Sequence, residues 1–159
     1  MRVLVAYGSK HGATAEIAEA IGVRLSDHGF DSEVVEAGDV SRPVSADAVV
    51  LGSSVYFGQW TKSARRAVAD LARDQFHGPV WMFHSGPTGD KADEHEPFPK
   101  KVNELAAPLD VRDWRTFGGK YDPTGHKVLG KVTAGEAGDW RDWAAIDAWA
   151  EGIADALAG

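Results

Sequence analysis

The chain has 159 residues, 43% of them hydrophobic, which predicts a single globular domain over residues 1–159 with a core of its own. Its 17 basic and 24 acidic residues give a net charge of −7, which argues against nonspecific binding to nucleic acid or anionic membranes. The absence of cysteine excludes disulfides, thiolate nucleophiles and cysteine-ligated metal clusters. No signal-peptide pattern or membrane-length apolar stretch is present, so we expect a cytoplasmic protein without an integral membrane segment.

The N-terminal stretch combines a short apolar run with a loop that suits an anion. The run begins at Val3, ends at Gly8 and is typical of a strand buried on both faces, because it is too short for a helix. The loop Ser9–Thr14 follows, and a helix is predicted over Ala15–Asp27. A helix N-terminus presents unpartnered backbone N–H groups and the positive end of the helix dipole. Taken alone, this stretch fits phosphate binding and a plain strand–turn–helix connection equally well.

Strands and helices continue to alternate through the middle of the chain. The next predicted elements are strands over Glu33–Glu36, Ala48–Ser53 and Val80–Phe83, and a helix from the N-cap residue Thr61 to about Arg73. The first of these strands is short and suits a sheet edge. The other two strands are apolar throughout, and each runs into glycine and hydroxyl residues.

The pattern that predicts strands and helices becomes less regular after the third apolar strand. The later predictions are a helix within Pro97–Leu109, a strand around Trp114–Phe117 and an irregular glycine-rich segment over residues 122–138. Asp139 is the predicted N-cap of a final helix, whose apolar stripe places Trp140 and Trp143 in the core. Trp149 falls off that stripe and suits an exposed interface.

Alternating strands and helices predict an α/β fold, with a parallel sheet, right-handed crossovers and helices on both faces. Such sheets bind ligands outside the carboxyl ends of the strands, where the strand order reverses. Three loops rich in glycine and hydroxyl residues each follow an apolar strand: Ser9–Thr14, Ser53–Trp60 and His84–Gly89. We therefore expect these loops to meet at one edge and form a composite site.

The first loop excludes several phosphate chemistries. Gly8 and Gly12 are separated by three residues and no lysine precedes Thr14, so Walker-type nucleotide hydrolysis is not expected. The dinucleotide fingerprint is absent, and no cysteine is available for phosphatase chemistry. Tyr7–Ser9 and Gly52–Ser54 lack the acidic residues of a response-regulator receiver. Of the phosphate chemistries considered, this leaves noncovalent phosphate binding by hydroxyls and backbone amides.

These loops resemble those of the flavodoxin family. Ser9–Thr14 matches the loop in which hydroxyls and backbone N–H groups hold the phosphate of FMN. Gly52–Trp60 carries the aromatic residues that the family places around the flavin ring, and Ser85–Gly89 falls at its second flavin-flanking loop. The resemblance implies a Rossmann-like, three-layer α/β/α sandwich with a five-stranded parallel sheet of order 2-1-3-4-5. More narrowly, Gly52–Trp60 and Gly138–Trp143 look like the branch that includes menaquinone-dependent protoporphyrinogen dehydrogenases.

The resemblance implies a set of FMN-binding residues: Ser9, Lys10, His11, Gly12, Ala13, Thr14, Ser54, Val55, Tyr56, Phe57, Gly58, Trp60, Ser85, Gly86, Pro87 and Gly89. Lys10 and His11 depart from the usual phosphate loop, and either contacts the phosphate through a charge-assisted hydrogen bond or points to solvent. Trp60 either stacks on the flavin or belongs to the core. Gly58 suits a backbone rearrangement beside the flavin, because glycine crosses the necessary conformations cheaply.

Two functions follow from the resemblance. One is an FMN-binding carrier that shuttles one or two electrons between redox partner proteins. The other is an FMN-dependent oxidoreductase, a quinone-linked dehydrogenase of the protoporphyrinogen type. A flavodoxin-like domain that has lost FMN is a third possibility. No catalytic residue is predicted, and no metal site either, because the run Asp93–Glu96 lacks the helical spacing of paired ligands.

Overall fold

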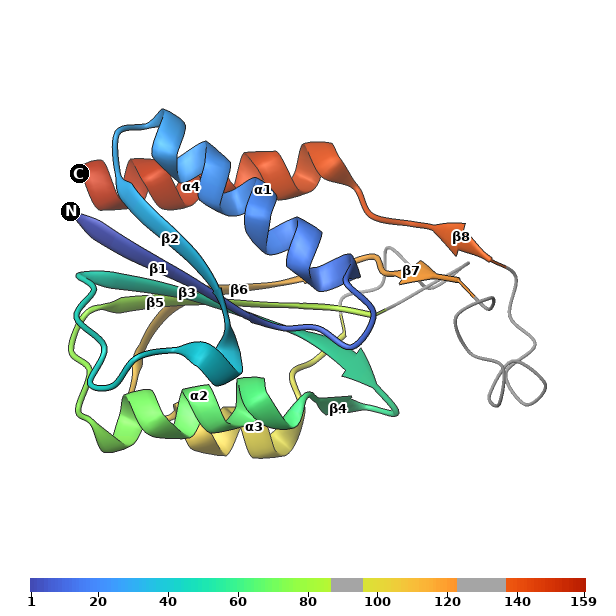
Figure 1. Ribbon diagram of the computed structural model, residues 1–159, viewed down its shortest axis with the longest axis horizontal. Coiled ribbons are helices and arrows are strands. Elements are labelled where there is room, and N and C mark those ends of the chain that lie inside the picture. The colour runs from blue at the N-terminus through green and yellow to red at the C-terminus, as the bar shows by residue number, and fades with distance from the viewer. Residues whose placement is uncertain (87–95, 123–136) are drawn as a thin grey trace.

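The computed structural model describes residues 1–86, 96–122 and 137–159, and its strands and helices alternate along most of the chain (Figure 1). The elements in chain order are β1 (Arg2–Gly8), α1 (Ala13–Asp27), β2 (Asp31–Glu36), the 3-10 helix η1 (Ala37–Asp39), β3 (Ala48–Tyr56), β4 (Gln59–Trp60), α2 (Lys62–Arg73), β5 (Pro79–Ser85), α3 (Lys100–Ala106), β6 (Asp110–Phe117), β7 (Lys120–Tyr121), β8 (Gly138–Asp139) and α4 (Trp143–Ala158). No helix among the described residues is long and apolar enough to cross a membrane.

The long strands form a parallel sheet in the order β2-β1-β3-β5-β6. Counting only these strands, this is the predicted order 2-1-3-4-5, so the predicted flavodoxin-like α/β/α sandwich is confirmed. The order reverses between β1 and β3, because β2 lies on one side of β1 and every later strand of the sheet lies on the other. The carboxyl end of β1 points toward the right of Figure 1, away from both chain termini.

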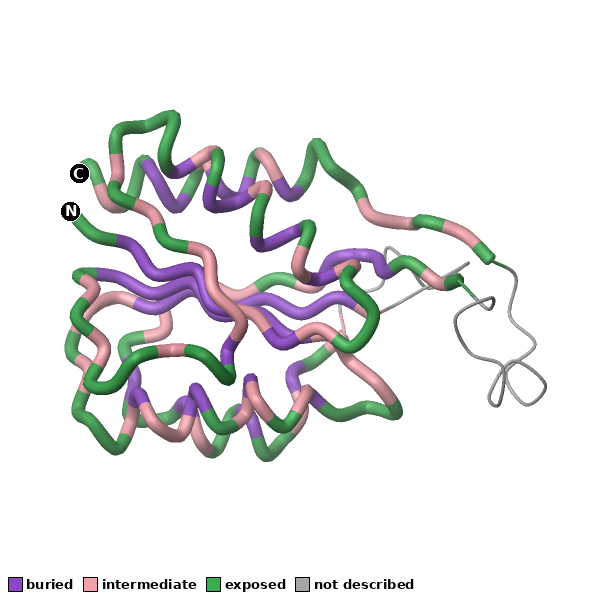
Figure 2. Tube along the Cα trace, in the orientation of Figure 1, coloured by how far each residue is buried: buried purple, intermediate pink, exposed green. Residues whose placement is uncertain are grey.

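Helices cover both faces of the sheet, α1 and α4 on one side and α2 and α3 on the other (Figure 1). In β1, Val3 and Val5 pack toward α1 and α4, whereas Leu4 and Ala6 pack toward α2. Successive side chains of a strand point to opposite faces, so the uninterrupted apolar run serves two cores at once. Figure 2 shows the resulting burial along the central strands and the inner sides of the helices.

The second and third predicted loops prove to be partly strand. β3 continues to Tyr56 and turns back into β4 through Phe57 and Gly58, whose φ angles are 51° and 70°. Positive φ at both central residues is the signature of a type I′ hairpin. His84 and Ser85 belong to β5, because Ser85 pairs with β3 on one side and with β6 on the other. The prediction that these residues lie in loops was wrong, since strand pairing prevailed over their turn-forming composition.

The final helix starts later than predicted. Its N-cap is Asp142, whose carboxylate accepts a hydrogen bond from the Ala145 N–H at 3.0 Å, whereas Asp139 lies in β8. Most of the predicted apolar stripe does face the core, but Trp143, in the first turn of the helix, is 43% exposed. Trp149 is 7% exposed and packs between aromatic rings of β5 and β6. The predictions for Asp139, Trp143 and Trp149 were therefore wrong.

Candidate functional site

A cavity of about 220 Å³ opens at the carboxyl edge of the sheet, beside the point where the strand order reverses. Open α/β sheets bind their ligands at this position. The residues that line it come from the carboxyl ends of β3 and β5 and from the chain that follows β1, β3, β5 and β6: Ser9, Lys10, His11, Ala13, Thr14, Ser54, Val55, Tyr56, Phe57, Ser85, Gly86, Gly119, Lys120 and Tyr121. Members of all three loops that the sequence singled out therefore meet at one edge.

Three of the predicted site residues do not line the cavity. Gly12 is the N-cap of α1 beside it, and Gly58 lies in the hairpin turn beyond it. Trp60 is 2% exposed and belongs to the core under α2, so of its two predicted placements the structure shows the core. Its indole N–H donates a hydrogen bond to Nδ1 of the buried His84 at 3.2 Å. Pro87 and Gly89, like most of the Asp93–Glu96 run, lie outside the described residues.

Gly119, Lys120 and Tyr121 line the cavity but were not predicted from the sequence. The signal was present in the glycine pair Gly118–Gly119, which ends a strand in the same way as the other three loops. Gly119 also approaches the next loop closely, because a Cβ built on it would lie 3.2 Å from the backbone of Gly86. A side chain at this position would push the two loops apart.

The N-terminus of α1 provides backbone donors at one end of the cavity. Gly12, the N-cap residue, has φ of 89° and offers no side chain to cap the helix. Glu16 is the first residue of the helix whose N–H bonds a helix carbonyl, that of Gly12 at 3.2 Å. The N–H groups of residues 13–15 lie in the first turn, where intrahelical acceptors are missing. Together with the helix dipole they form an anion-binding position.

Hydroxyl groups surround the same end of the cavity. Oγ1 of Thr14 and Oγ of Ser85 form a buried hydrogen bond of 2.8 Å, which joins the start of α1 to the end of β5. The Ser9 hydroxyl accepts a hydrogen bond from the Gly12 N–H at 2.9 Å and so holds the loop closed. The Ser54 hydroxyl is buried and has no hydrogen-bond partner among the described residues. A buried hydroxyl without a partner costs free energy, which a polar ligand in the cavity would recover.

Aromatic and cationic side chains form the other end. The Lys10 ammonium lies 3.9 Å from the centre of the Tyr56 ring, and the His11 ring meets Tyr56 edge-on with the ring centres 6.4 Å apart. Phe57 packs edge-on against Tyr56 at 4.5 Å and is 79% exposed. The structure thus places Lys10 over an aromatic ring, a favourable cation–π position. Lys120 adds a second positive charge, and no described lining residue carries a carboxylate.

Arg141 does not line the cavity but contacts the first turn of α1. Its side chain is only 4% exposed, donates to the Ala13 carbonyl at 3.1 Å and also pairs with Glu16. Its guanidinium forms a bidentate pair with Asp139, through bonds of 2.9 and 2.7 Å. These hydrogen bonds lower the pKa of Asp139 to about 2, below the ordinary 3.8, and raise the pKa of Arg141. The sequence assigned no role to Arg141.

The described lining fits a ligand with an anionic end and a flat apolar body. Backbone N–H groups and hydroxyls gather at the α1 end, where they match an anion. Val55 and Tyr56 add apolar and aromatic lining, and the closely packed backbones of Gly86 and Gly119 carry no side chains that would fill the cavity. The chemistry of the site therefore agrees with the phosphate and ring expected from the sequence.

Comparisons with known proteins agree with this fold. A mutant of the flavodoxin from Pseudomonas aeruginosa has 18% identity and a TM-score of 0.67, and oxidised Flavodoxin 2 from Bacillus cereus has 20% and 0.67, each match covering 100% of both chains. A flavoprotein in complex with FMN from Lactobacillus acidophilus has 19% identity and a TM-score of 0.54, over 73% of this chain and 93% of that chain. No curated protein matches the sequence. The flavodoxin domain family matches residues 4–132, and the chain therefore belongs to this family.

Proposed function

We propose that the chain binds FMN in the cavity at the carboxyl edge of the sheet and carries one or two electrons between redox partners. Membership of the flavodoxin domain family supports this function. The observation that carries it is the combination of free first-turn N–H groups in α1 with the unpaired buried hydroxyl of Ser54 in the same lining. Without a polar ligand, both features cost free energy, because polar groups lack hydrogen-bond partners.

The proposed roles follow from the positions of the side chains. Residues 13–15 offer backbone N–H groups, and Thr14 offers a hydroxyl, to the phosphate of FMN. Tyr56 lies where it can contact the flavin ring from one side, and the glycine backbones of Gly86 and Gly119 leave room for a flat group. Lys10 and Lys120 bring positive charge to an anionic cofactor. Bound FMN supplies the one- and two-electron chemistry, while the protein supplies binding and electrostatics.

Access for a redox partner is provided at the same edge. Phe57 is 79% exposed at the tip of the β3–β4 hairpin and lines the cavity. Its φ of 51° is unusual for a bulky residue, and the hairpin holds its ring outward despite that cost. A partner that docks against this tip would lie next to the proposed flavin position, as electron transfer between proteins requires.

The quinone-linked dehydrogenase function rests on the sequence resemblance of Gly52–Trp60 and Gly138–Trp143. Trp60 lies in the core, and Arg141 binds the first turn of α1. Both residues therefore have structural roles outside the cavity lining. The carrier function is accordingly the one that the described geometry favours.

Absorption spectroscopy and titration of the purified full chain test the proposal. We expect flavin bands after FMN addition and saturable binding of one FMN per chain. Riboflavin should bind about a hundredfold more weakly, because it lacks the phosphate and loses hydrogen bonds to a charged group of about 1.5–3 kcal/mol each. An absence of FMN binding, or equal affinities for the two flavins, would contradict the phosphate site. Turnover of protoporphyrinogen with a quinone would favour the dehydrogenase over the carrier.

A further inference from the structure

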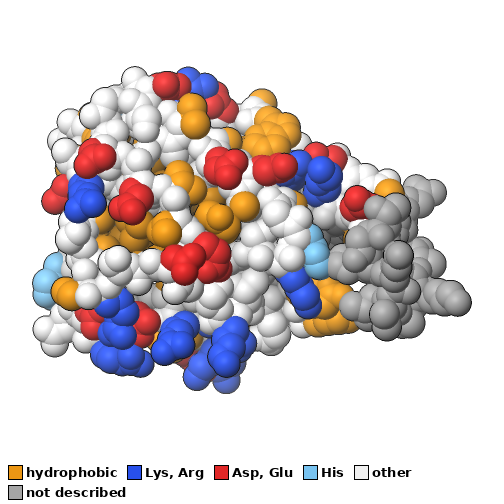
Figure 3. Space-filling model, viewed as in Figure 1, with side chains coloured by type: hydrophobic (Ala, Val, Ile, Leu, Met, Phe, Trp, Pro, Cys, Tyr) orange, Lys and Arg blue, Asp and Glu red, His pale blue; other side chains and the backbone are white. Residues whose placement is uncertain are grey.

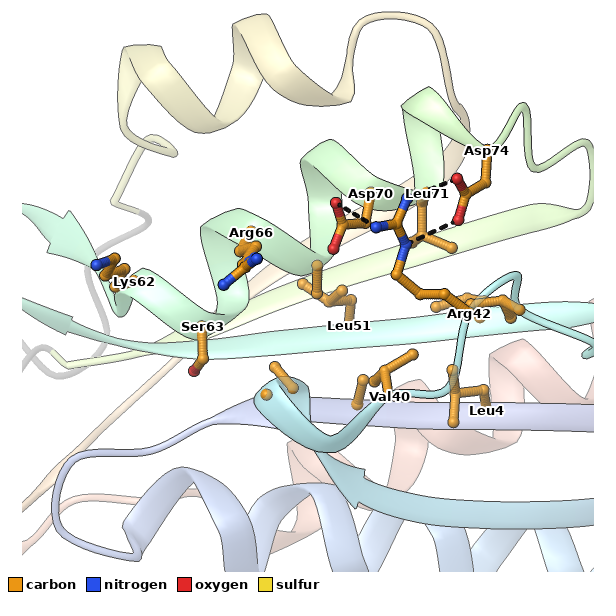
Figure 4. Close-up of a pocket in the computed structure, with 16 residues that line it drawn as sticks. Leu4, Val40, Arg42, Leu51, Lys62, Ser63, Arg66, Asp70, Leu71 and Asp74 are labelled. Atoms are coloured by element: carbon orange, nitrogen blue, oxygen red, sulfur yellow. Dashed lines mark hydrogen bonds and ion pairs between the residues drawn. The ribbon is translucent and has the colours of Figure 1, made fainter.

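A second and larger cavity, of about 610 Å³, lies on the face of the sheet that α2 covers, between α2, η1 and residues 40–44 (Figure 4). It exists because the β2–β3 crossover is short. That crossover, residues 37–47, is fully described and contains only η1, whereas α1, α2 and α3 fill the other crossovers of the parallel sheet. A parallel crossover with a packed helix takes a dozen or more residues. Beside α2, this part of the sheet is therefore covered by η1 and residues 40–44 of the crossover and not by a second packed helix.

The floor of this second cavity is apolar. Leu4 from β1, Leu51 from β3 and Leu71 from α2 line it and are 8%, 1% and 4% exposed. Val40 and Val44 add apolar surface from the crossover. The volume lies within the range of about 300–1,000 Å³ that is usual for small-molecule sites, which also combine an apolar lining with a few polar groups.

One end of the second cavity is electrically neutral. Arg42 reaches from the crossover to α2, as Figure 4 shows, and makes a bidentate pair with Asp74 through bonds of 2.9 and 2.6 Å. It also pairs with Asp70 at 3.4 Å, and Arg73 pairs with Asp70 at 2.9 Å. These four side chains balance one another in charge. They hold the crossover against α2 and offer no free charge to a ligand.

The other end carries free positive charge. Lys62 and Arg66 are one turn apart on α2, line the cavity and form no ion pair with any described residue. Figure 3 shows Lys and Arg side chains gathered over α2, along the lower margin of the face in view. Glu36 is joined to this end, because its oxygens accept hydrogen bonds from the Ser63 hydroxyl at 2.9 Å and the Gly38 N–H at 2.5 Å. Among the described residues, neither Glu36 nor Asp70, which lies one turn after Arg66, forms an ion pair with Lys62 or Arg66.

We propose that this second cavity binds a small amphipathic anion, a carboxylate on an apolar chain or ring. The carboxylate lies between Lys62 and Arg66, and the apolar body lies against Val40 and Val44 above the apolar floor. Charge complementarity selects an anion in a chain whose net charge is −7 and which otherwise repels anions. Val40 and Val44 in the lining are only half-buried, and a small, fully polar anion would leave this apolar surface exposed to water.

Octanoate and 1-octanol are suitable probes, because they share an apolar chain and differ in the carboxylate. Binding is measured on the full chain by calorimetry and by backbone amide chemical shifts. The test variant is K62Q/R66Q, and the matched control is K100Q/K101Q, which removes two charges from exposed positions of the neighbouring helix α3. Gln has a helix propensity close to that of Lys and Arg, so both variants are expected to fold.

We expect octanoate to shift the amides of Val40, Leu51 and Ala67. Its dissociation constant should rise about five- to tenfold in K62Q/R66Q, the effect of two partly exposed charge contacts, and should stay unchanged in K100Q/K101Q. The affinity for 1-octanol should be the same in all three proteins. Equal weakening in both variants would show nonspecific attraction and overturn the proposal. Shifts centred on Ser9–Thr14, or no saturable binding at millimolar octanoate, would overturn it as well.

Discussion

The Arg141 guanidinium donates a hydrogen bond to the backbone carbonyl of Ala13 at 3.1 Å, so residues 128 positions apart in the chain are joined. Ala13 begins α1 and lines the cavity at the carboxyl edge of the sheet. The same guanidinium pairs with Glu16 and Asp139, which further restricts the first turn of α1. The position of the proposed phosphate site therefore depends on a segment that follows the last strand of the chain.

Replacing Arg141 by Gln should weaken both the fold and the FMN site. We expect the free energy of unfolding to fall by about 2 kcal/mol, because hydrogen bonds to charged groups and the packing of a buried arginine stem are lost. FMN should bind about tenfold more weakly, a loss of about 1.4 kcal/mol. Urea denaturation and FMN titration measure the two effects. Arg112→Gln is the control, since it removes a charge from an exposed pair with Asp110 and should change neither quantity.

Acidification should remove the contribution of the Asp139–Arg141 pair. The pKa of Asp139 in the folded chain is about 2, below the ordinary 3.8, so the pair stabilises the fold above pH 4 and loses its effect as the pH falls toward 2. The carboxylate is 39% exposed, so the contribution is about 1 kcal/mol after allowance for solvent screening.

Asp139→Asn should therefore be less stable than the unmodified protein near pH 7, and the difference should vanish near pH 2. Urea midpoints measured between pH 2 and pH 7 check this course. Asp39→Asn serves as the control, because Asp39 is exposed and forms no ion pair with a described residue. A stability difference that does not change with pH would show that the pair acts through packing instead.

The buried hydrogen bond between Thr14 and Ser85 should appear as coupling in a double-mutant cycle. Thr14→Val and Ser85→Ala each leave the other hydroxyl buried without its partner, at a cost of about 1–2 kcal/mol. The double variant should cost about 1 kcal/mol less than the sum of the single variants. Thr14→Val should also weaken FMN binding. Strict additivity in urea denaturation would mean that the two hydroxyls do not interact in solution.

Trp60 and Tyr56 should separate stability from cofactor binding. Trp60→Phe removes the N–H donor to His84 and should lower the free energy of unfolding by about 1–2 kcal/mol, with FMN affinity unchanged. Tyr56→Leu should weaken FMN binding roughly threefold to tenfold, because an aromatic contact of about 0.5–1.5 kcal/mol is lost. FMN titration of both variants measures the affinity, and thermal unfolding measures the stability. A larger loss of FMN affinity in Trp60→Phe would contradict the placement of Trp60 in the core.

Some boundaries and burial assignments could not be predicted from the sequence. Ser85 has the composition of a turn, yet it is strand because β3 and β6 pair with it from both sides. Trp149 is buried because it shares the inner side of α4 with Ile146 and packs against Phe83 of β5 and Phe117 of β6. In each case neighbours far away in the chain decided the outcome.

The sequence by itself determined the strand–loop–helix unit from β1 to α1 and the sandwich around it. Its apolar run, its glycine and hydroxyl loop and its helix periodicity are local properties, and alternating strands and helices admit few topologies. Only the tertiary structure showed that Gly119–Tyr121 line the cavity and that Trp60 lies in the core instead. It also showed that Arg141 forms a hydrogen bond to the first turn of α1. These relationships join residues that are distant in the chain, and no local pattern encodes them. Packing alone decides which of them meet.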